Sequence, residues 1–257
     1  MTLLHALIIS IVEGITEFLP ISSTGHMILI SNLLRIAESD FVKSFEIIIQ
    51  LGAIGAVAVL YFRKLLLNKQ VFLRVCVAFL PTAFVGLVFY KFIKTMLLGN
   101  PWIVVCSLGI GGVLLIMLEI FHKEHARYTG EIKDITFIQA MFIGISQSFS
   151  IIPGVSRAAA TIAGALFMGI KRDTAVEFSF LLAIPTMAGA TGLDLVKSAK
   201  HFTGNEYILL AVGLIGAFVS AILVVKWFTG YVKNHTFIPF GVYRIVLALA
   251  YYLYILR

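Results

Sequence analysis

Long apolar stretches alternate with short polar loops along most of this chain. A helix needs roughly 20 consecutive apolar residues to cross a bilayer, and six stretches come near that length. We expect the following segments to be spanning helices: Phe45–Phe62, Val71–Tyr90, Trp102–Phe121, Glu177–Leu195, Tyr207–Phe228 and Phe237–Leu256.

Two further apolar regions, Thr2–Leu34 and Phe137–Ile170, are broken near their middles by Pro20 and by Pro153-Gly154. Proline ends the helical hydrogen-bond pattern, and freed backbone groups are tolerated at membrane depth only where they face protein or a watery cavity. We therefore expect each region to be a re-entrant hairpin of two short helices.

This order of breaks and spans occurs twice, at an offset of about 130–140 residues. The matching pieces are Gly14-Ile-Thr-Glu17 with Gly144-Ile-Ser-Gln147, Pro20-Ile-Ser22-Ser23 with Pro153-Gly-Val-Ser156-Arg157, Glu46 with Glu177, and Pro101-Trp with Pro239-Phe. Three spans separate the two hairpins, so the hairpins must enter from opposite faces. The pattern predicts an all-α polytopic membrane protein with two inverted-topology repeats. We expect one integral membrane domain over residues 1–257, with repeat one at about 1–125 and repeat two at about 135–257.

Composition agrees with a membrane protein and excludes a soluble globular domain. Hydrophobic residues make up 60% of the chain and charged residues 13%, and the mean hydropathy is +1.01. The net charge of +7 suits anionic membranes and anionic substrates. Basic residues are scattered through short loops rather than gathered into a patch with aromatics, so nucleic acid is not an expected partner. Lysine and arginine are more frequent in the loops on the side of Arg63, Lys64 and Arg74, which we expect to be cytoplasmic.

Polar residues gather at the first break. Glu13 and Glu17 are four residues apart and therefore share one helix face. Two such carboxylates repel unless a cation or a shared proton lies between them, and a hard divalent ion that also binds phosphate oxygens would satisfy both. The alternative is that one or both carboxylates cap a helix end or pair with Arg157.

Ser22, Ser23 and Thr24 follow the proline and open a second short helix, whose backbone N–H groups and dipole favour an anion. Ordinary capping explains part of the same pattern. His26 lies one turn beyond Ser23. It could take the serine proton, act as nucleophile or protonate a leaving group, or it could be a hydrogen-bonded packing residue.

The second break supplies an arginine. Arg157 suits bidentate phosphate binding, and in a low-dielectric site it would stabilise charge on a transferred phosphoryl group. Its alternative is a salt bridge to Glu13 or Glu17 that locks the two halves together. Ser156 and Thr161 could bond backbone carbonyls or a ligand. Because broken helices of an inverted repeat meet near the midplane, we expect one shared cavity for Glu13, Glu17, Ser22, Ser23, His26, Ser156 and Arg157.

Charged residues elsewhere have simpler interpretations. Glu46 and Glu177 occupy equivalent repeat positions, where satisfying helix N-termini or polar loops is the expected task. Arg244 lies about two turns into the last span, and we expect it to snorkel or to pair with a carboxylate.

Together these motifs resemble those of the undecaprenyl-diphosphatase family of bacterial membranes, also called the bacitracin-resistance phosphatases. The first signature is present from Glu13 to His26. The second, Pro-Gly-x-Ser-Arg-Ser-Gly-x-Thr, is matched at Pro153, Gly154, Ser156, Arg157 and Thr161 and departs at Ala158 and Ala159. The run Glu177-Phe-Ser-Phe-Leu-Leu-Ala-Ile-Pro-Thr-Met-Ala-Gly is also family-like, and the resemblance extends over nearly the whole chain.

The resemblance implies hydrolysis of the C55 isoprenoid diphosphate to the monophosphate carrier of cell-wall synthesis. It also implies a divalent cation, Mg²⁺ or Ca²⁺, the bacterial inner membrane, and a cavity open to the periplasmic or outer side. By position, the implied catalytic residues are Glu17, Ser23, His26 and Arg157; those that bind substrate are Ser22, Thr24, Gly154, Ser156, Arg157 and Thr161; and those that bind metal are Glu13 and Glu17. Ala158 lacks a hydroxyl that the family usually has.

Phosphoryl transfer depends mainly on positioning and charge stabilisation, which these residues can supply. We favour Ser23 as nucleophile, with His26 or a water activated by Glu17 as alternatives. The rival function is a transporter or flippase of an anionic isoprenoid lipid or phosphate, because inverted repeats are typical of carriers. An intramembrane serine protease is disfavoured, since the chain has no Gly-x-Ser-Gly element. Small-residue faces permit a homodimer without requiring one.

Overall fold

A computed structural model describes residues 1–37, 39–89, 101–122, 128–198 and 202–255 of the chain. In these residues the structure is helical, and it has no β-strand beyond one isolated bridge between Thr129 and Ile170. The α-helices are α1 (Leu3–Thr16), α2 (Ser23–Leu33), α3 (Asp40–Leu66), α4 (Lys69–Val88), α6 (Pro101–Phe121), α7 (Phe137–Ser148), α8 (Arg157–Phe167), α9 (Arg172–Ser198), α10 (Gly204–Tyr231) and α11 (Ile238–Ile255).

The helices match the apolar segments expected from the sequence, so the all-α membrane fold is confirmed. Among the described residues, five helices are long and apolar enough to cross a membrane: α3, α4, α6, α9 and α10. The sixth expected span forms α11, which is apolar but shorter. The expected endpoints Tyr90 and Leu256 lie outside the described residues. Large apolar side chains such as Ile110 and Leu223 remain exposed on the outside of the bundle, as expected where lipid is the solvent.

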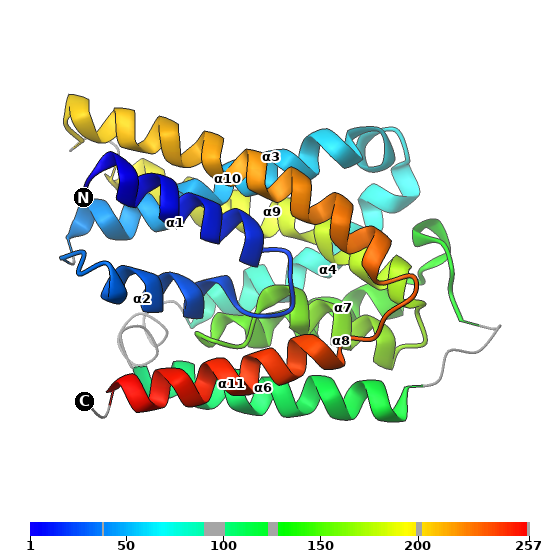
Figure 1. The fold of residues 1–257 in the computed structure, drawn as a ribbon. Coiled ribbons are helices and arrows are strands. Elements are labelled where there is room, and N and C mark those ends of the chain that lie inside the picture. Colours follow the sequence, from blue (N-terminus) through cyan, green and yellow to red (C-terminus); the bar gives the residue numbers. More distant parts are fainter. Residues whose placement is uncertain (38, 90–100, 123–127, 199–201, 256–257) are drawn as a thin grey trace.

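Both interrupted regions are helical hairpins. Pro20 lies in the turn between α1 and α2, and Pro153 lies in the turn between α7 and α8, after a short 3₁₀ helix at Phe149–Ile151. In Figure 1 the turn between α1 and α2 lies in the middle of the molecule, whereas the N- and C-termini lie together at one end. The first hairpin therefore turns back inside the protein.

The first helix of each hairpin packs closely on a long helix. α1 packs on α10, and α7 packs on α4. Gly14 and Gly144 allow these approaches, because an added Cβ would lie 2.5 Å from the Ala217 carbonyl oxygen and 2.1 Å from the Ala78 carbonyl oxygen respectively. This matched packing of α1 and α7 is what two equivalent halves of the chain would give. The inverted insertion of the halves into a membrane, and the cytoplasmic side of the loops, stay predictions.

Packing also anchors the first break. Phe18 follows Glu17 and is fully buried, with its ring edge-on to Phe180 of α9 at a centroid distance of 5.4 Å. The central α3 and α9 pack on each other, and α6 pairs with α11. The turn that carries Glu17 is therefore held by the core rather than by its own short helices.

Candidate active site

The first break places a carboxylate against a serine. Glu17 ends α1, and Ser22 begins α2 as its N-cap, with a positive φ of 71° and a side chain that accepts from the Gly25 N–H. Ser23 Oγ donates a hydrogen bond of 2.5 Å to Glu17 Oε2. Both side chains are buried, so the group in position to take the Ser23 proton is Glu17.

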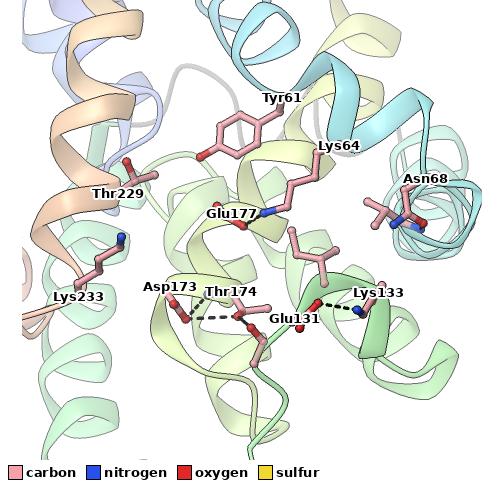
Figure 2. Close-up of a pocket in the computed structure, with 13 residues that line it drawn as sticks. Tyr61, Lys64, Asn68, Glu131, Lys133, Asp173, Thr174, Glu177, Thr229 and Lys233 are labelled. Atoms are coloured by element: carbon pink, nitrogen blue, oxygen red, sulfur yellow. Dashed lines mark hydrogen bonds and ion pairs between the residues drawn. The ribbon is translucent and has the colours of Figure 1, made fainter.

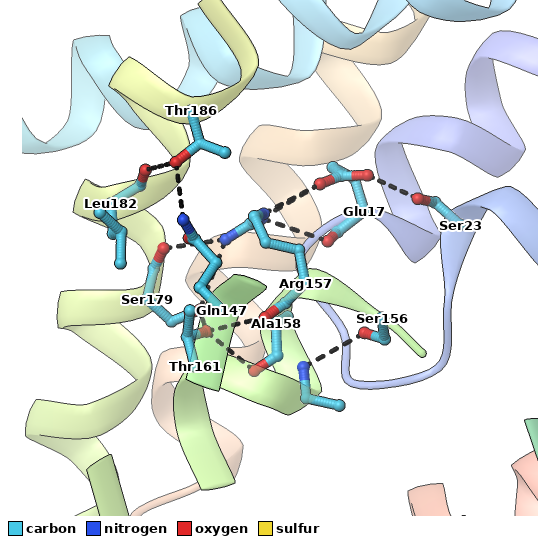
Figure 3. Close-up of polar contacts among 11 residues, drawn as sticks. Glu17, Ser23, Gln147, Ser156, Arg157, Ala158, Thr161, Ser179, Leu182 and Thr186 are labelled. Carbon is cyan, nitrogen blue, oxygen red and sulfur yellow. Dashed lines mark hydrogen bonds and ion pairs between the residues drawn. The ribbon is translucent and has the colours of Figure 1, made fainter. Parts of the chain in front are cut away.

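The second break delivers an arginine to the same carboxylate (Figure 3). Ser156 caps α8 with a φ of 75°, close to that of Ser22, and its side chain accepts from the Ala159 N–H. Arg157 follows, and its Nη2 lies 3.1 Å from Glu17 Oε1. The two polar strings, 140 residues apart in the chain, are thus in contact. The ion pair left open by the sequence is present, and it joins Arg157 to Glu17.

The guanidinium of Arg157 is held from its other side as well. Its Nη1 donates to the Ser179 carbonyl oxygen at 2.9 Å, and its Cζ lies 5.7 Å from the centre of the Phe18 ring. Thr161 Oγ1 lies 2.6 Å from Ser179 Oγ and bonds the backbone carbonyls of its own helix. Thr161 is fully buried behind Arg157, so its contacts favour support of the arginine over contact with a ligand.

Arg244 differs from its expected role. It neither snorkels nor pairs with a carboxylate in the contacts that the structure gives it; it is fully buried and donates only to backbone carbonyl oxygens. Those acceptors are Pro20, Gly154, Val155, Ser107 and Leu108, at 2.9–3.4 Å. Pro20 belongs to the first break and Gly154 and Val155 to the second. The reason for the difference is that each proline break leaves backbone carbonyl oxygens unpaired inside the protein. The buried guanidinium of Arg244 donates hydrogen bonds to them.

Glu13 is the second carboxylate of the predicted metal pair. It is fully buried, one helical turn before Glu17, and neither of its side-chain oxygens has a hydrogen-bond partner among the residues that the structure describes. Hard divalent cations prefer such oxygens, and Mg²⁺ commonly binds through one or two carboxylates while water and phosphate complete its shell. Glu13 and Glu17 therefore fit a cation shared with a phosphate. The described part of the chain has no group of three or more acidic, histidine or cysteine side chains that would hold a metal by itself.

His26 does not reach Ser23 through the hydrogen bonds of its ring. Nδ1 lies 2.7 Å from the Ser22 carbonyl oxygen, and Nε2 lies 2.7 Å from the Tyr243 hydroxyl. The packing alternative for this histidine accordingly has geometric support, and its proposed proton-transfer role stays a prediction.

The remaining expected ligand residues divide into two groups. Ser22 and Ser156 are buried helix caps. Thr24 is exposed, outside the buried cluster. Gly154 has a φ of 93° and directs its carbonyl oxygen to Arg244, while an added Cβ would lie 2.7 Å from the Val104 carbonyl oxygen. Close approach to α6 thus requires glycine there.

Sequence reasoning missed three residues at this centre. Two of them could have been found from the sequence. Ser179 lies in the family-like run that begins at Glu177, and Gln147 is the repeat counterpart of Glu17. Gln147 Nε2 donates to Thr186 Oγ1 at 3.1 Å (Figure 3). No sequence pattern pointed to Tyr243, because its partner His26 is 217 residues away.

A separate pocket of about 440 Å³ is lined by residues of α3, α4, α9 and α10 and by the 130–133 segment (Figure 2). Its charged side chains largely pair with one another: Lys64 with Glu177, and Lys133 with Glu131 at 2.9 Å. The hydrogen bond and the charge of Lys133 hold the pKa of Glu131 below its ordinary value, and Glu131 raises the pKa of Lys133. Glu177 thus bridges α9 to α3 through its ion pair with Lys64, and the nucleophile candidates lie elsewhere.

Fold and site together define a multi-pass membrane protein with a buried serine, carboxylate and arginine held between two helical hairpins. The chain belongs to the bacitracin resistance protein BacA family, whose model matches residues 6–250.

Relatives of nearly full length support the same assignment. A protein of Sulfurihydrogenibium sp. (strain YO3AOP1) is 48% identical over 254 residues, which is 99% of this chain and 100% of the relative. A protein of Aquifex aeolicus (strain VF5) is 48% identical over 98% of both chains. One of Campylobacter jejuni (serotype O:23/36, strain 81-176) is 47% identical over 98% of this chain and 94% of its own. All three are named undecaprenyl-diphosphatase, a name that does not support the transporter alternative.

Proposed function

We propose that this protein hydrolyses undecaprenyl diphosphate to undecaprenyl phosphate and inorganic phosphate. The observation that carries the proposal is the continuous contact from Ser23 through Glu17 to Arg157, which combines a nucleophile, a proton acceptor and a phosphate-binding cation across the two hairpins. Such a set exceeds what binding alone requires. The family membership and the relatives' names support the same reaction.

In the first step, Ser23 Oγ attacks the terminal phosphorus in line with the bond to the leaving phosphate. The bond from that phosphorus to the bridging oxygen breaks, undecaprenyl phosphate leaves, and the serine proton passes to Glu17 Oε2. The leaving oxygen becomes a phosphate oxygen of undecaprenyl phosphate and needs no added proton. In the second step, water attacks the phosphoserine, the bond between phosphorus and Ser23 Oγ breaks, Glu17 returns its proton to Ser23 Oγ, and inorganic phosphate leaves with both protons of the water. A water activated by Glu17 that attacks the substrate directly is the alternative.

Arg157 would act by electrostatics. Its guanidinium pairs with Glu17 in the structure, and a phosphate oxygen can replace that carboxylate on the fork. The replacement releases Glu17 for proton transfer and leaves Arg157 on the charge that develops in the transition state. Ser179 and Phe18 hold the guanidinium in place during this exchange.

A divalent cation belongs to the proposal, with Glu13 and Glu17 as its protein ligands. When bound, such a cation supplies positive charge that neutralises phosphate oxygens. Glu13 holds two buried oxygens that no donor in the described part of the chain satisfies, which supports this assignment. We also propose that the protein lies in the bacterial inner membrane with its site open to the periplasmic or outer side; a homodimer stays a prediction.

The deciding experiment measures phosphate release from purified, detergent-solubilised protein given undecaprenyl diphosphate, with and without chelator. We expect turnover that chelator abolishes and that Glu17→Ala or Arg157→Ala lowers by about 10²–10³-fold, which is within the ranges for removing a general base or a transition-state charge partner. Ser148→Ala is the matched control, because among the described residues that hydroxyl bonds the Gly144 carbonyl within its own helix and no proposed site residue. A transporter would release no phosphate.

Rapid quenching with labelled substrate tests the covalent step. Label on Ser23 in the wild type, and loss of turnover in Ser23→Ala, would support the phosphoserine. Turnover that persists in Ser23→Ala without labelled serine would instead favour direct attack by water. Full activity in both Glu17→Ala and Arg157→Ala would refute the site.

A further inference from the structure

The last helix reaches the start of α2 through one aromatic side chain. Tyr243 of α11 places its hydroxyl 2.7 Å from His26 Nε2, and the two rings are nearly parallel, at 6° with centroids 5.5 Å apart. Tyr243 is 44% exposed, whereas His26 is 7% exposed. The tyrosine thus covers one nitrogen of an otherwise enclosed imidazole.

These contacts fix the tautomer of His26. Nδ1 lies 2.7 Å from the Ser22 carbonyl oxygen, which can only accept, so Nδ1 must carry a hydrogen. In a neutral imidazole the other nitrogen is then an acceptor. The Tyr243 hydroxyl is the group in position to donate to it. The tyrosine therefore favours the ring that donates from Nδ1 to Ser22.

Ser22 is the residue directly before the proposed nucleophile, and its backbone has a positive φ of 71°. Its carbonyl oxygen accepts from both the ring and the backbone N–H of His26, at 2.7 Å and 3.3 Å. A non-glycine residue keeps such a conformation only when its surroundings determine it. His26 is one of those surroundings, and Tyr243 orients His26.

The second half of the chain provides an internal comparison. Ser156 adopts the same strained cap, with a φ of 75°, and the residue four positions later is Ala160, which holds the Ser156 carbonyl through its backbone N–H alone. A strained serine cap therefore forms here without any histidine. The ring and its tyrosine are an addition confined to the hairpin that carries Ser23.

We propose that Tyr243 is a positioning residue for the hydrolysis: it holds His26 in the Nδ1–H form, and His26 in turn fixes the Ser22 carbonyl and so the direction of Ser23. This inference rests on the proposed function. Because Tyr243 acts through His26 and touches neither Glu17 nor Arg157 in the hydrogen bonds of the structure, its loss should lower kcat and leave KM nearly unchanged.

The test compares Tyr243→Phe with Tyr254→Phe in the full-length, detergent-solubilised protein. Tyr254 lies on the same helix and is equally exposed at 44%, so it controls for loss of a hydroxyl from α11. We expect Tyr243→Phe to lower kcat about tenfold, as for one lost hydrogen bond to a buried group, with KM changed less than twofold. Tyr254→Phe should behave as the wild type.

A tautomer measurement separates this role from a general effect on folding. With ¹⁵N-labelled histidine, the His26 signals are identified by their absence from His26→Asn. The wild type should show the Nδ1–H tautomer, and Tyr243→Phe should also populate the Nε2–H form. An unchanged kcat in Tyr243→Phe would overturn the proposal, as would a lowered kcat with an unchanged tautomer.

Two further outcomes keep the tests separate. If Tyr243→Phe does not fold, the wild-type spectrum decides, because an Nε2–H tautomer in the wild type contradicts the proposal. If the wild type releases no phosphate, the proposed function fails, while the spectra still show whether Tyr243 controls His26.

Discussion

Replacing Gly111 by alanine tests whether Arg244 holds the two breaks together. Gly111 lies in the interior of α6, and a Cβ added there would lie 2.1 Å from Arg244 Nη2 and 2.8 Å from its Cζ. Real Cβ atoms do not approach other atoms so closely, and the guanidinium must move away. The substitution thus disturbs Arg244 without altering any proposed catalytic residue.

The structure gives the size of the effect. Nη2, the atom in the clash, donates to the Ser107 and Gly154 carbonyl oxygens, both at 3.0 Å. Hydrogen bonds from a charged group contribute about 1.5–3 kcal/mol each, so the loss of two destabilises the fold by about 3 kcal/mol at the lower end of that range. Alanine in place of a helical glycine returns about 1 kcal/mol. We therefore expect a net loss of about 2 kcal/mol.

The assay is reversible unfolding of the purified protein in mixed detergent micelles, followed by tryptophan fluorescence. Gly86→Ala in α4 is the matched control, because a Cβ there meets nothing within 4 Å. That variant should be as stable as the wild type or more stable by up to about 1 kcal/mol. A Gly111→Ala protein that is no less stable than the wild type would refute the assignment of Arg244 as the tie between the breaks.

Two further predictions concern ion pairs outside the active site. The side chain of Glu119 is fully buried and accepts from Arg172 at 2.7 Å and from the Phe237 N–H at 3.1 Å. Glu119→Ala should therefore lower the unfolding free energy by about 3–5 kcal/mol. Glu177→Ala breaks the more exposed pair with Lys64 and should lower it by less than about 1 kcal/mol. Equal losses in the same unfolding assay would contradict this ranking. Because Lys133 holds the pKa of Glu131 below 4.5, the pair favours the folded state above that pH and loses its effect as the pH falls through the lowered pKa. Lys133→Ala should move the Glu131 titration, followed by carboxyl NMR, back toward 4.5; an unmoved midpoint would show that Lys133 is not the cause.

Local sequence was sufficient for the helices and the breaks. Apolar runs of spanning length predicted α3, α4, α6, α9 and α10, because lipid favours long apolar segments with internally satisfied backbone. Pro20 and Pro153 predicted the hairpin turns, since neither residue can continue a helix. Ser22 was predicted at a helix start by its side-chain oxygen, although its positive φ was not. The capping role of Ser156 was not predicted.

Sequence by itself also singled out the candidate site residues, because carboxylates, hydroxyls and an arginine are costly in an apolar chain and stand out from it. Only the tertiary structure decided their partners. Arg157 meets Glu17 across 140 residues, Tyr243 meets His26 across 217, and Arg244 meets the Pro20 carbonyl across 224. Local patterns predict which groups a helix end exposes, but not which distant donor will satisfy a buried carbonyl. That choice depends on how the two hairpins and α11 pack together. It is why Arg244, expected to snorkel or to pair with a carboxylate, instead lies between the two breaks and donates to their carbonyl oxygens.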